Sequence, residues 1–311
     1  MPADTPRLSA GMTNQHKLGR IGVWSAGLRA ESAQSGVTNG GADRSAEIRE
    51  AVAELEELGY GTVWIGGSPS PSQAATVLQA TSRITVATGI LSIWNHPADE
   101  LAARHTELNR AHGGRFLLGL GVSHSRLTDR YHRPYTAMTE YLDKLDTAAA
   151  PVPPGERVLA ALGPRMLRLA RDRAAGAHPY LVTAEHTAQA RALLGPDALL
   201  APEFKVVLDQ DPDRARSTAR AYLGGYLSLP NYANNLLRLG FTEEDLREGG
   251  SDRLVDSLFA LGDEQTIRRH VEAFLAAGAD HLAVQLVTAD PTGALPREQW
   301  RLLADVLPLT G

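Results

Sequence analysis

The sequence predicts an α/β protein built as a single (β/α)8 TIM barrel, and three observations predict it. Apolar strand-like runs alternate with amphipathic helix-like segments, which is typical of a parallel sheet. Counting gives eight such strands, the number that closes this type of barrel. The chain has 311 residues, of which 43% are hydrophobic, and this is enough for one large core of that kind.

The predicted strands are short and mostly apolar, as expected for parallel strands that are covered on both faces. They fall at residues 20–25, 62–65, 84–91, 116–122, 157–162, 178–182, 199–208 and 281–287. The first predicted helix, 45–58, repeats apolar residues every three or four positions and ends before Gly59, a residue suited to a helix C-terminus. The other predicted helices are 71–80, 97–112, 135–145, 165–173, 185–194, 264–277 and 296–306.

Two segments are longer than this alternation requires. Residues 123–156 follow the fourth strand and residues 221–261 follow the seventh. Long excursions in a compact domain usually form lids or binding loops, and the carboxyl ends of barrel strands carry the active site. We therefore expect insertions after strands four and seven, at the catalytic mouth.

Composition and charge argue against several classes of function. The net charge is −5 without a basic run, so nucleic acid is not an expected partner. Cysteine is absent, and the histidine spacing gives no metal-ligand pattern, so no metal site is predicted. No stretch of about 18 apolar residues would span a membrane. Residues 1–17 lack the apolar core of a signal peptide, which predicts a disordered leader before a barrel domain at 18–311, and a cytoplasmic location.

The most informative segment runs from residue 115 to residue 125 and reads RFLLGLGVSHS. A buried strand passes through Gly119 and Gly121 and ends in a polar tip with Ser123 and His124. Glycines let a backbone or a ligand approach closely, and the imidazole of His124 can exchange protons near neutral pH. The segment indicates a ligand site at a strand end, although a plain strand-to-loop turn with an exposed histidine would read the same.

Two further strand ends carry local signals. Gly163 and Pro164 open a helix directly after a strand, and the unpaired amides of a helix start attract anions, with Arg165 as an added cation. An ordinary turn with a solvent-facing arginine is the alternative. Gly89 interrupts the third strand and indicates a bulge or a close backbone approach, for a ligand or for packing alone.

With these motifs the chain resembles the luciferase-like monooxygenase superfamily, and more narrowly its actinobacterial branch that uses the deazaflavin coenzyme F420. The segments that carry the resemblance occur in the same order over nearly the whole chain after residue 18. They are 86–90 with 96–97, 115–124, 163–170, and 229–232 with 236–241.

The resemblance implies where a cofactor would bind. The ring would rest against the bulge in strand three, often at a non-proline cis peptide, here Gly89–Ile90. The turn after strand five would hold the phosphate, and His124 takes the position of a proton-donating carboxylate in related sugar-phosphate dehydrogenases. The expected cofactor-binding residues are Gly67, Gly89, Ile90, Leu91, Gly121, Val122, Ser123, Leu162, Gly163, Pro164, Arg165 and Met166, with His124 as the catalytic residue.

One departure limits the substrate. Those dehydrogenases carry an Asp-His pair at the end of strand two, where this chain has Gly66 and Gly67. The resemblance therefore predicts an F420-dependent oxidoreductase that moves a hydride between the deazaflavin and a small organic substrate, without sugar-phosphate specificity. An FMN-dependent monooxygenase and a non-catalytic flavin-binding barrel remain as alternatives. Helices 71–80 and 97–112 carry apolar residues beyond the need of one barrel flank, which predicts a homodimer.

Overall fold

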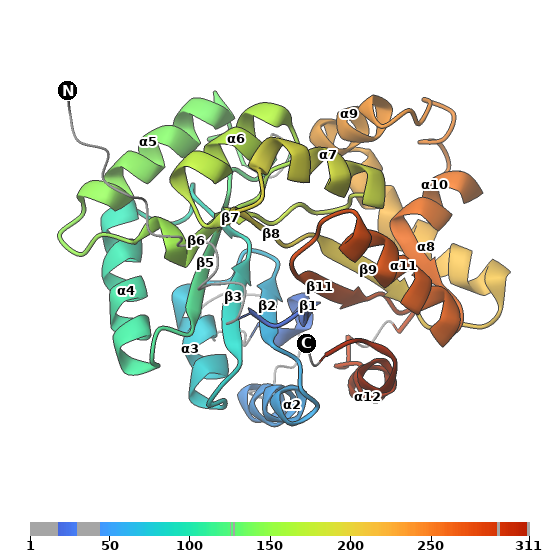
Figure 1. The fold of residues 1–311 in the computed structure, drawn as a ribbon, viewed down its shortest axis with the longest axis horizontal. Helices are drawn as coiled ribbons and strands as arrows, with labels where there is room; N and C mark the ends of the chain where they lie inside the picture. The colour runs from blue at the N-terminus through green and yellow to red at the C-terminus, as the bar shows by residue number, and fades with distance from the viewer. Residues whose placement is uncertain (1–17, 30–43, 125, 127, 291–292, 310–311) are drawn as a thin grey trace.

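The computed structural model describes residues 18–29, 44–124, 126, 128–290 and 293–309, so the predicted leader at 1–17 lies outside the described residues. The fold is α/β, with one curled sheet whose strands all pair in parallel (Figure 1). The strands are β1 Ile21–Ser25, β2 Thr62–Gly66, β3 Thr85–Gly89, β4 Leu91–Ser92, β5 Phe116–Gly121, β6 Arg157–Leu159, β7 Gly176–Ala177, β8 Leu199–Leu200, β9 Glu203–Val207, β10 Phe259–Leu261 and β11 Leu282–Leu286.

The order of the strands shows how the sheet curls. The path runs β10-β9-β11-β1-β2-β3-β5-β6-β7-β8, with β4 paired to β5. Its last strand, β8, is separated by only two residues from β9, which lies near the start of the path. The sheet therefore turns back on itself, and the amide of Glu203 donates to the carbonyl of Pro179 at 2.8 Å across the join.

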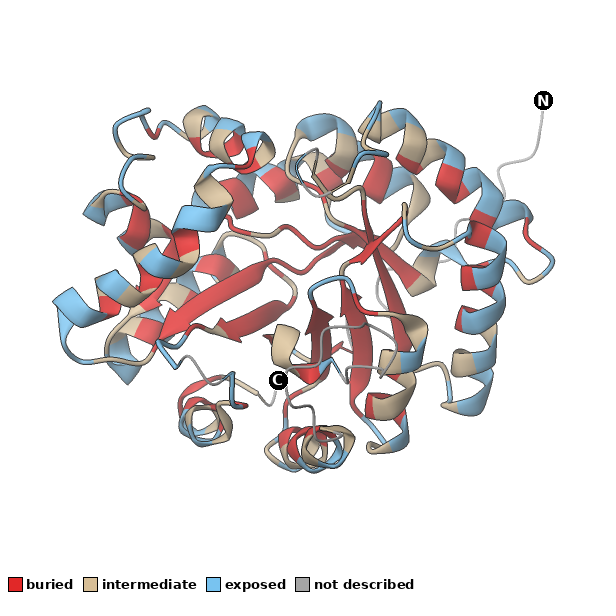
Figure 2. Cartoon of the chain, turned by 180° about the vertical axis from the view of Figure 1, so that it is seen from behind, coloured by how far each residue is buried: buried red, intermediate tan, exposed pale blue. Residues whose placement is uncertain are grey.

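The helices lie outside the sheet and bury one face against it, as Figure 2 shows by the red inner and blue outer surfaces. Glycine or proline marks several helix ends, as the sequence predicts; Gly59 follows the first helix with a φ of 93°. The helices are α2 Ser45–Glu57, α3 Pro71–Gln79, α4 Ala98–Ala111, α5 Pro134–Thr147, α6 Pro164–Arg173, α7 Ala184–Leu194, α8 Pro212–Leu227, α9 Pro230–Arg238, α10 Asp252–Leu258, α11 Glu264–Ala276 and α12 Arg297–Val306, with short 3-10 turns at Ala26–Leu28 and Pro154–Glu156.

The interior of the curled sheet is filled by large rings opposite small residues. Trp64 is fully buried, stacks on His178 at 4.1 Å between ring centroids and donates its Nε1–H to Nε2 of His281 at 3.0 Å. Nδ1–H of His281 donates to the carbonyl of Gly19 at 2.8 Å. Burial lowers the pKa of His281 to about 4 and that of His178 to about 3, so both imidazoles are neutral at pH 7.

The prediction of a strand at 178–182 is wrong. The strand at this place is β7, and it ends at Ala177. Pro179 has no amide proton for a ladder, and Leu181 has a φ of 55°, which extended backbone does not adopt. Pro202 likewise divides the predicted strand 199–208 into β8 and β9.

The long segment 221–261 contains structure that the sequence did not reveal. The end of α8, all of α9 and α10, and strand β10 fall within it. β10 has only three residues and pairs with β9 through Phe259 and Lys205, so its apolar run was too short to identify beforehand.

The predicted interruption of the third strand is present. β3 ends at Gly89, the peptide bond Gly89–Ile90 is cis, and β4 begins at Leu91. The side chain of Thr88 bridges the gap in the ladder, because its hydroxyl donates to the carbonyl of Gly119 and accepts from the Gly119 amide, both at 2.8 Å. The polar groups freed by the break are thus satisfied within the sheet.

A candidate active site at the strand ends

The carboxyl ends of β2 and β3 rest on the indole of Trp24. Its Nε1–H donates to the carbonyl of Gly89 at 3.1 Å, and the side chain is only 5% exposed. A Cβ at Gly66 would lie 2.3 Å from the indole, and one at Gly89 would lie 2.5 Å from Nε1. We call Trp24 with the strand ends at Gly66 and Gly89 the indole floor. Both positions need glycine because the indole takes the space of a side chain.

The glycines of β5 are also close to the protein itself. A Cβ at Gly119 would lie 1.9 Å from the carbonyl oxygen of Thr88, and one at Gly121 would lie 2.3 Å from Cδ1 of Ile90. Of the two explanations for these glycines, close packing therefore accounts for both. The bulge between β3 and β4 is what they accommodate.

His124 lies where β5 ends and meets α9. Its Nδ1 is 2.8 Å from Oδ1 of Asn231, and its ring lies 5.2 Å from that of Tyr232. Because an amide oxygen can only accept, Nδ1 carries the proton in the neutral ring and Nε2 keeps a lone pair. Burial lowers the pKa of His124, and the hydrogen bond with Asn231 partly opposes this shift. The imidazole is neutral at pH 7 and able to accept a proton at Nε2.

The turn before α6 has no side chain to cap the helix. Gly163 is the N-cap residue and Pro164 the first helical residue, so the first helical amide protons belong to Arg165 and Met166. The carbonyl of Leu162 accepts from Nε2 of His186 at 2.9 Å, which fixes the turn. The start of this helix suits an anion.

Arg165 points to a different neighbour than the sequence suggests. Its guanidinium carbon lies 4.3 Å from the ring centre of Tyr135 on α5, a cation–π contact on an exposed part of the molecule. A second arginine, Arg238 at the end of α9, has its Nη2 3.8 Å from the position that a Cβ on Gly163 would take. Sequence reasoning gave Arg238 no role.

The other expected cofactor residues lie along the same strand ends. Gly67 has a φ of 72° and its carbonyl accepts from Arg29 at 2.9 Å. The carbonyl of Val122 accepts from Nε1 of Trp94 at 2.5 Å, and Ser123 adopts a φ of 59°. Leu91 is fully buried in β4, whereas Met166 is half-buried at the start of α6.

A cluster of tyrosines beside the indole floor was not predicted. The hydroxyls of Tyr180, Tyr222 and Tyr226 contact one another, and Tyr180 and Tyr222 donate to Oε1 of Gln285 at 3.1 and 3.2 Å. The ring of Tyr180 lies 5.4 Å from that of Trp24. Burial raises the pKa of Tyr180 well above its usual value, so this phenol stays protonated.

A buried ion pair packs against this tyrosine cluster. Lys205 pairs with Glu203, and its Nζ lies 4.0 Å above the ring of Tyr180. Burial lowers the pKa of Lys205 and raises that of Glu203, and each charge opposes the shift of the other. The sequence contained two signals for this cluster. One is a lysine within a strand of a lysine-poor chain, and the other is the i, i+4 spacing of Tyr222 and Tyr226.

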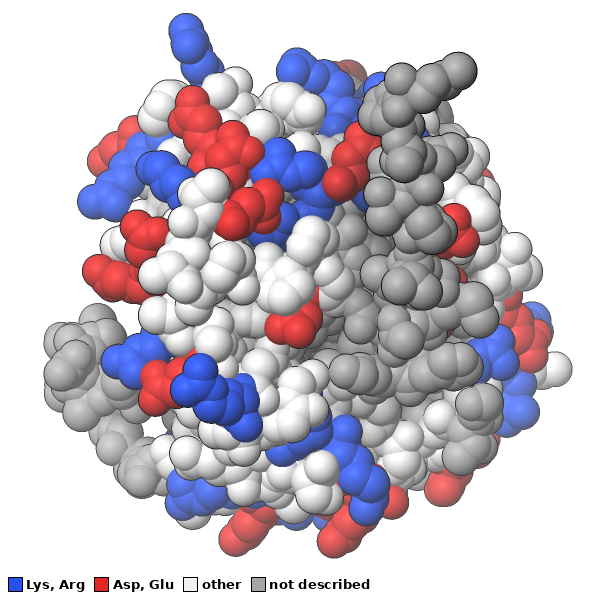
Figure 3. Space-filling model, turned by 60° about the vertical axis from the view of Figure 1, so that its left-hand side comes forward, with Lys and Arg blue, Asp and Glu red and all other residues white. Residues whose placement is uncertain are grey.

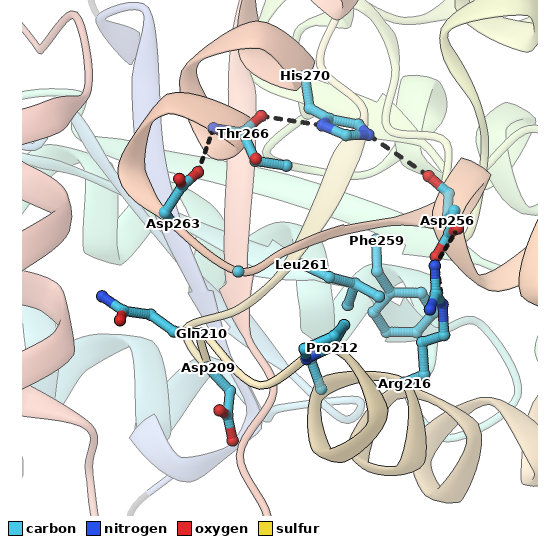
Figure 4. A pocket seen from close by; sticks show the side chains of 12 residues that line it. Asp209, Gln210, Pro212, Arg216, Asp256, Phe259, Leu261, Asp263, Thr266 and His270 are labelled. Atoms are coloured by element: carbon cyan, nitrogen blue, oxygen red, sulfur yellow. Dashed lines mark hydrogen bonds and ion pairs between the residues drawn. The ribbon is translucent and has the colours of Figure 1, made fainter.

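Two cavities lie away from the ends of β2, β3 and β5. Figure 4 shows one of about 670 Å³ between the starts of α8 and α11. Arg216 pairs with Asp256 there at 2.8 Å and Asp263 caps α11, so these side chains already have structural roles. A second cavity, of about 790 Å³, lies between α3 and α4.

The described part of the chain holds no cluster of residues that could bind a metal ion. None of its helices is long and apolar enough to cross a membrane. On the face shown in Figure 3, acidic and basic side chains are interspersed, in keeping with totals of 36 and 31.

The curled parallel sheet with helices outside it defines an α/β protein of the TIM-barrel type. The chain belongs to the luciferase-like monooxygenase family, whose family model matches residues 22–281. The resemblance inferred from the sequence is therefore confirmed. A search of curated proteins finds no match.

Solved structures with this fold include enzymes that use different cofactors. The coenzyme F420-dependent tetrahydromethanopterin reductase from Methanopyrus kandleri has a TM-score of 0.71 at 16% identity, covering 93% of this chain and 98% of that chain. An F420-dependent secondary alcohol dehydrogenase in complex with an F420–acetone adduct has a TM-score of 0.69 at 14% identity, and the match covers 94% of this chain and 98% of that chain. The oxygenating constituent of 3,6-diketocamphane monooxygenase from Pseudomonas putida, in complex with FMN, has a TM-score of 0.60 at 14% identity. That match covers 94% of this chain and 98% of that chain.

Proposed function

We propose that the protein is an F420-dependent oxidoreductase that transfers a hydride between the deazaflavin and a small organic substrate. One observation carries the proposal: the indole floor, the neutral imidazole of His124 and the uncapped start of α6 lie at the same carboxyl edge of a parallel sheet. Two F420-dependent enzymes are among the solved structures that share the fold, which supports a deazaflavin, and an FMN-bound enzyme shares it as well.

The residues present fit such a cofactor. The amides of Arg165 and Met166 at the start of α6 would hold a phosphoryl group, since they have no partner within the helix. Trp24 closes the interior of the sheet beneath Gly66 and Gly89, so a ring would lie above it against Gly89–Leu91. Gly67, Gly121, Val122 and Ser123 would border the same space. When bound, the deazaflavin supplies the hydride chemistry.

His124 would handle the proton that accompanies the hydride. In its neutral form Nδ1–H is engaged with Asn231, so only Nε2 is free to take a proton from a substrate hydroxyl. In the reverse direction Nε2–H would return a proton to the carbonyl oxygen. Asn231 is a positioning residue that fixes the tautomer.

The cofactor is tested by anaerobic titration of the protein with F420 and with FMN. The proposal predicts a lower dissociation constant for F420, followed by hydride transfer in a single turnover. Tighter binding of FMN with oxygen-dependent product formation would instead make the protein a monooxygenase. Tight binding without any turnover across a panel of alcohols, aldehydes and ketones would favour the non-catalytic barrel.

We also propose that two copies pair through α3 and α4. Among the apolar residues of these two helices, Leu78, Leu101 and Ala102 are buried in the core of the chain itself. Ala75 and Leu108 line the groove between the two helices, with Glu100, Arg104 and Glu107. A two-fold contact would cover this groove, and light scattering at micromolar concentration tests it. A monomeric mass would contradict the dimer.

A further inference from the structure

The start of α6 faces two donor groups of α9 that the proposed function leaves without a task. Nη2 of Arg238 lies 3.8 Å from the position that a Cβ on Gly163 would take. The same Nη2 donates to Oδ1 of Asn235 at 2.9 Å. Asn235 lies about one helical turn before Arg238 on α9, and this hydrogen bond holds the guanidinium in place. A side chain at Gly163 would therefore contact this cation.

Asn235 supplies a buried donor that has nothing to bind. The residue is only 2% exposed, and among the described residues its Nδ2 has no hydrogen-bond partner. Nδ2 belongs to the same planar group as Oδ1 and so lies beside the guanidinium of Arg238. Burying an amide donor without a partner is costly, which indicates that an acceptor occupies this place in the working protein.

The polar groups at the start of α6 and on the facing part of α9 are all hydrogen-bond donors. The guanidinium of Arg238, the amide of Asn235 and the backbone N–H groups of Arg165 and Met166 all donate, and the positive end of the α6 dipole adds to their charge. Because a phosphoryl group offers several anionic acceptor oxygens, it can satisfy all of these donors at once.

We propose that Arg238 and Asn235 of α9 complete a phosphate-binding site at the start of α6. α9 thereby contacts both ends of the site, with Asn231 on His124 and Arg238 on the phosphoryl group. The assignment of this group to the cofactor rests on the proposed function. The site itself is an anion site of this chain.

The test compares each phosphorylated ligand with a counterpart that lacks the phosphoryl group. Wild-type protein, Arg238→Ala and Arg238→Lys are titrated with F420 and its phosphate-free deazaflavin alcohol, and with FMN and riboflavin. For whichever pair binds, Arg238→Ala weakens the phosphorylated ligand by roughly 10- to 100-fold, the range for losing a charge-assisted hydrogen bond. It leaves the affinity of the phosphate-free ligand within about twofold, and Arg238→Lys recovers part of the loss.

The matched control is Arg168→Ala, which removes an exposed arginine from α6, the helix whose start forms the site, and keeps both affinities. Equal losses for both ligands in Arg238→Ala, or no loss at all, would overturn the proposal. A phosphate-specific loss in Arg165→Ala alone would also overturn it, because the anion would then lie on the Tyr135 side of the helix.

A further arm separates this inference from the proposed function. Thermal unfolding is followed with and without inorganic phosphate, at constant ionic strength. If wild-type protein binds neither F420 nor FMN, the proposed function fails. A phosphate-dependent rise in Tm that Arg238→Ala abolishes would still support the anion site. If that rise is missing as well, or persists in Arg238→Ala, the anion site fails too.

Discussion

The indole floor and the residues of α9 that contact His124 and approach Gly163 are built in opposite ways. The floor is made by glycines whose missing side chains admit Trp24, so its shape depends on backbone and one large ring. The second set, which we call the α9 cap, consists of Asn231, Tyr232, Asn235 and Arg238, and acts through polar side chains. This difference teaches that the floor determines where a ligand can lie, whereas the cap determines how charge and protons are handled.

The largest effect is expected where His124 joins the two regions. His124→Ala should lower turnover by roughly 10²–10⁴-fold, because it removes the group that exchanges a proton with the substrate. Cofactor affinity should be largely unchanged. The check is a single-turnover rate and a dissociation constant on the same variant. A loss of binding with a preserved rate would make His124 a cofactor ligand instead.

Asn231→Ala provides the matched control on the cap. It leaves the imidazole but frees its tautomer, so the turnover should fall by about tenfold only. Because the hydrogen bond with Asn231 raises the pKa of His124, its loss should move the acidic inflection of kcat/KM to lower pH. An unchanged inflection would show that another group titrates.

The floor is tested by Trp24→Ala, which should lower the free energy of unfolding by about 3–5 kcal/mol. The indole is almost fully buried, and its loss leaves a cavity beneath Gly66 and Gly89. Trp94→Ala is the control, since Trp94 is only half-buried and should cost less. Urea denaturation of both variants decides the matter. An equal cost would mean that the floor is ordinary packing.

The buried imidazole of His281 should make the free energy of unfolding depend on pH. The pKa of His281 is about 4 in the folded protein and about 6.5 in the unfolded chain, so the unfolded chain binds more protons between these values. The stabilisation is present above about pH 6.5 and is lost as the pH falls towards 4, by a few kcal/mol. Urea denaturation at pH 7 and pH 5 measures the loss.

The variant His281→Gln sharpens this test. An amide can accept from Trp64 and donate to Gly19 as the neutral imidazole does, but it does not titrate. The difference in stability between pH 7 and pH 5 should therefore shrink. A difference as large as in the wild-type protein would assign the pH dependence to other groups.

A smaller effect is expected at the edge of the floor. Gly66→Ala places a methyl group 2.3 Å from the indole of Trp24, which must shift, at a cost of about 1–3 kcal/mol. Gly224→Ala is the control, because nothing lies within 4 Å of its Cβ position on α8, and alanine favours the helix. A stabilising effect of Gly66→Ala would refute the close fit between glycine and indole.

The sequence predicted the floor better than the cap because the floor depends on local signals. Gly89, a glycine within a strand pattern, marks its own strand end. Trp24, by contrast, looked like one more apolar residue of a strand, and only the three-dimensional fold brings it under Gly66.

The cap could not be predicted because its contacts join distant parts of the chain. His124 and Asn231 are 107 residues apart, and Arg238 reaches Gly163 from another helix. The family resemblance marked residues 229–232 and 236–241 as part of a shared pattern without giving Asn231 or Arg238 a task. The alternation of strands and helices, in contrast, was sufficient for the fold class, while Pro179 and Pro202 limited the accuracy of two strand ends.

The most direct test of the account is a crystal structure of the protein with F420 bound. The account predicts that the deazaflavin ring lies above Trp24 against Gly89–Leu91, that the phosphoryl group contacts the amides of Arg165 and Met166 with Arg238, and that Nε2 of His124 faces the reacting side of the ring. A ring bound away from the indole floor, or a phosphoryl group placed elsewhere than the start of α6, would contradict it.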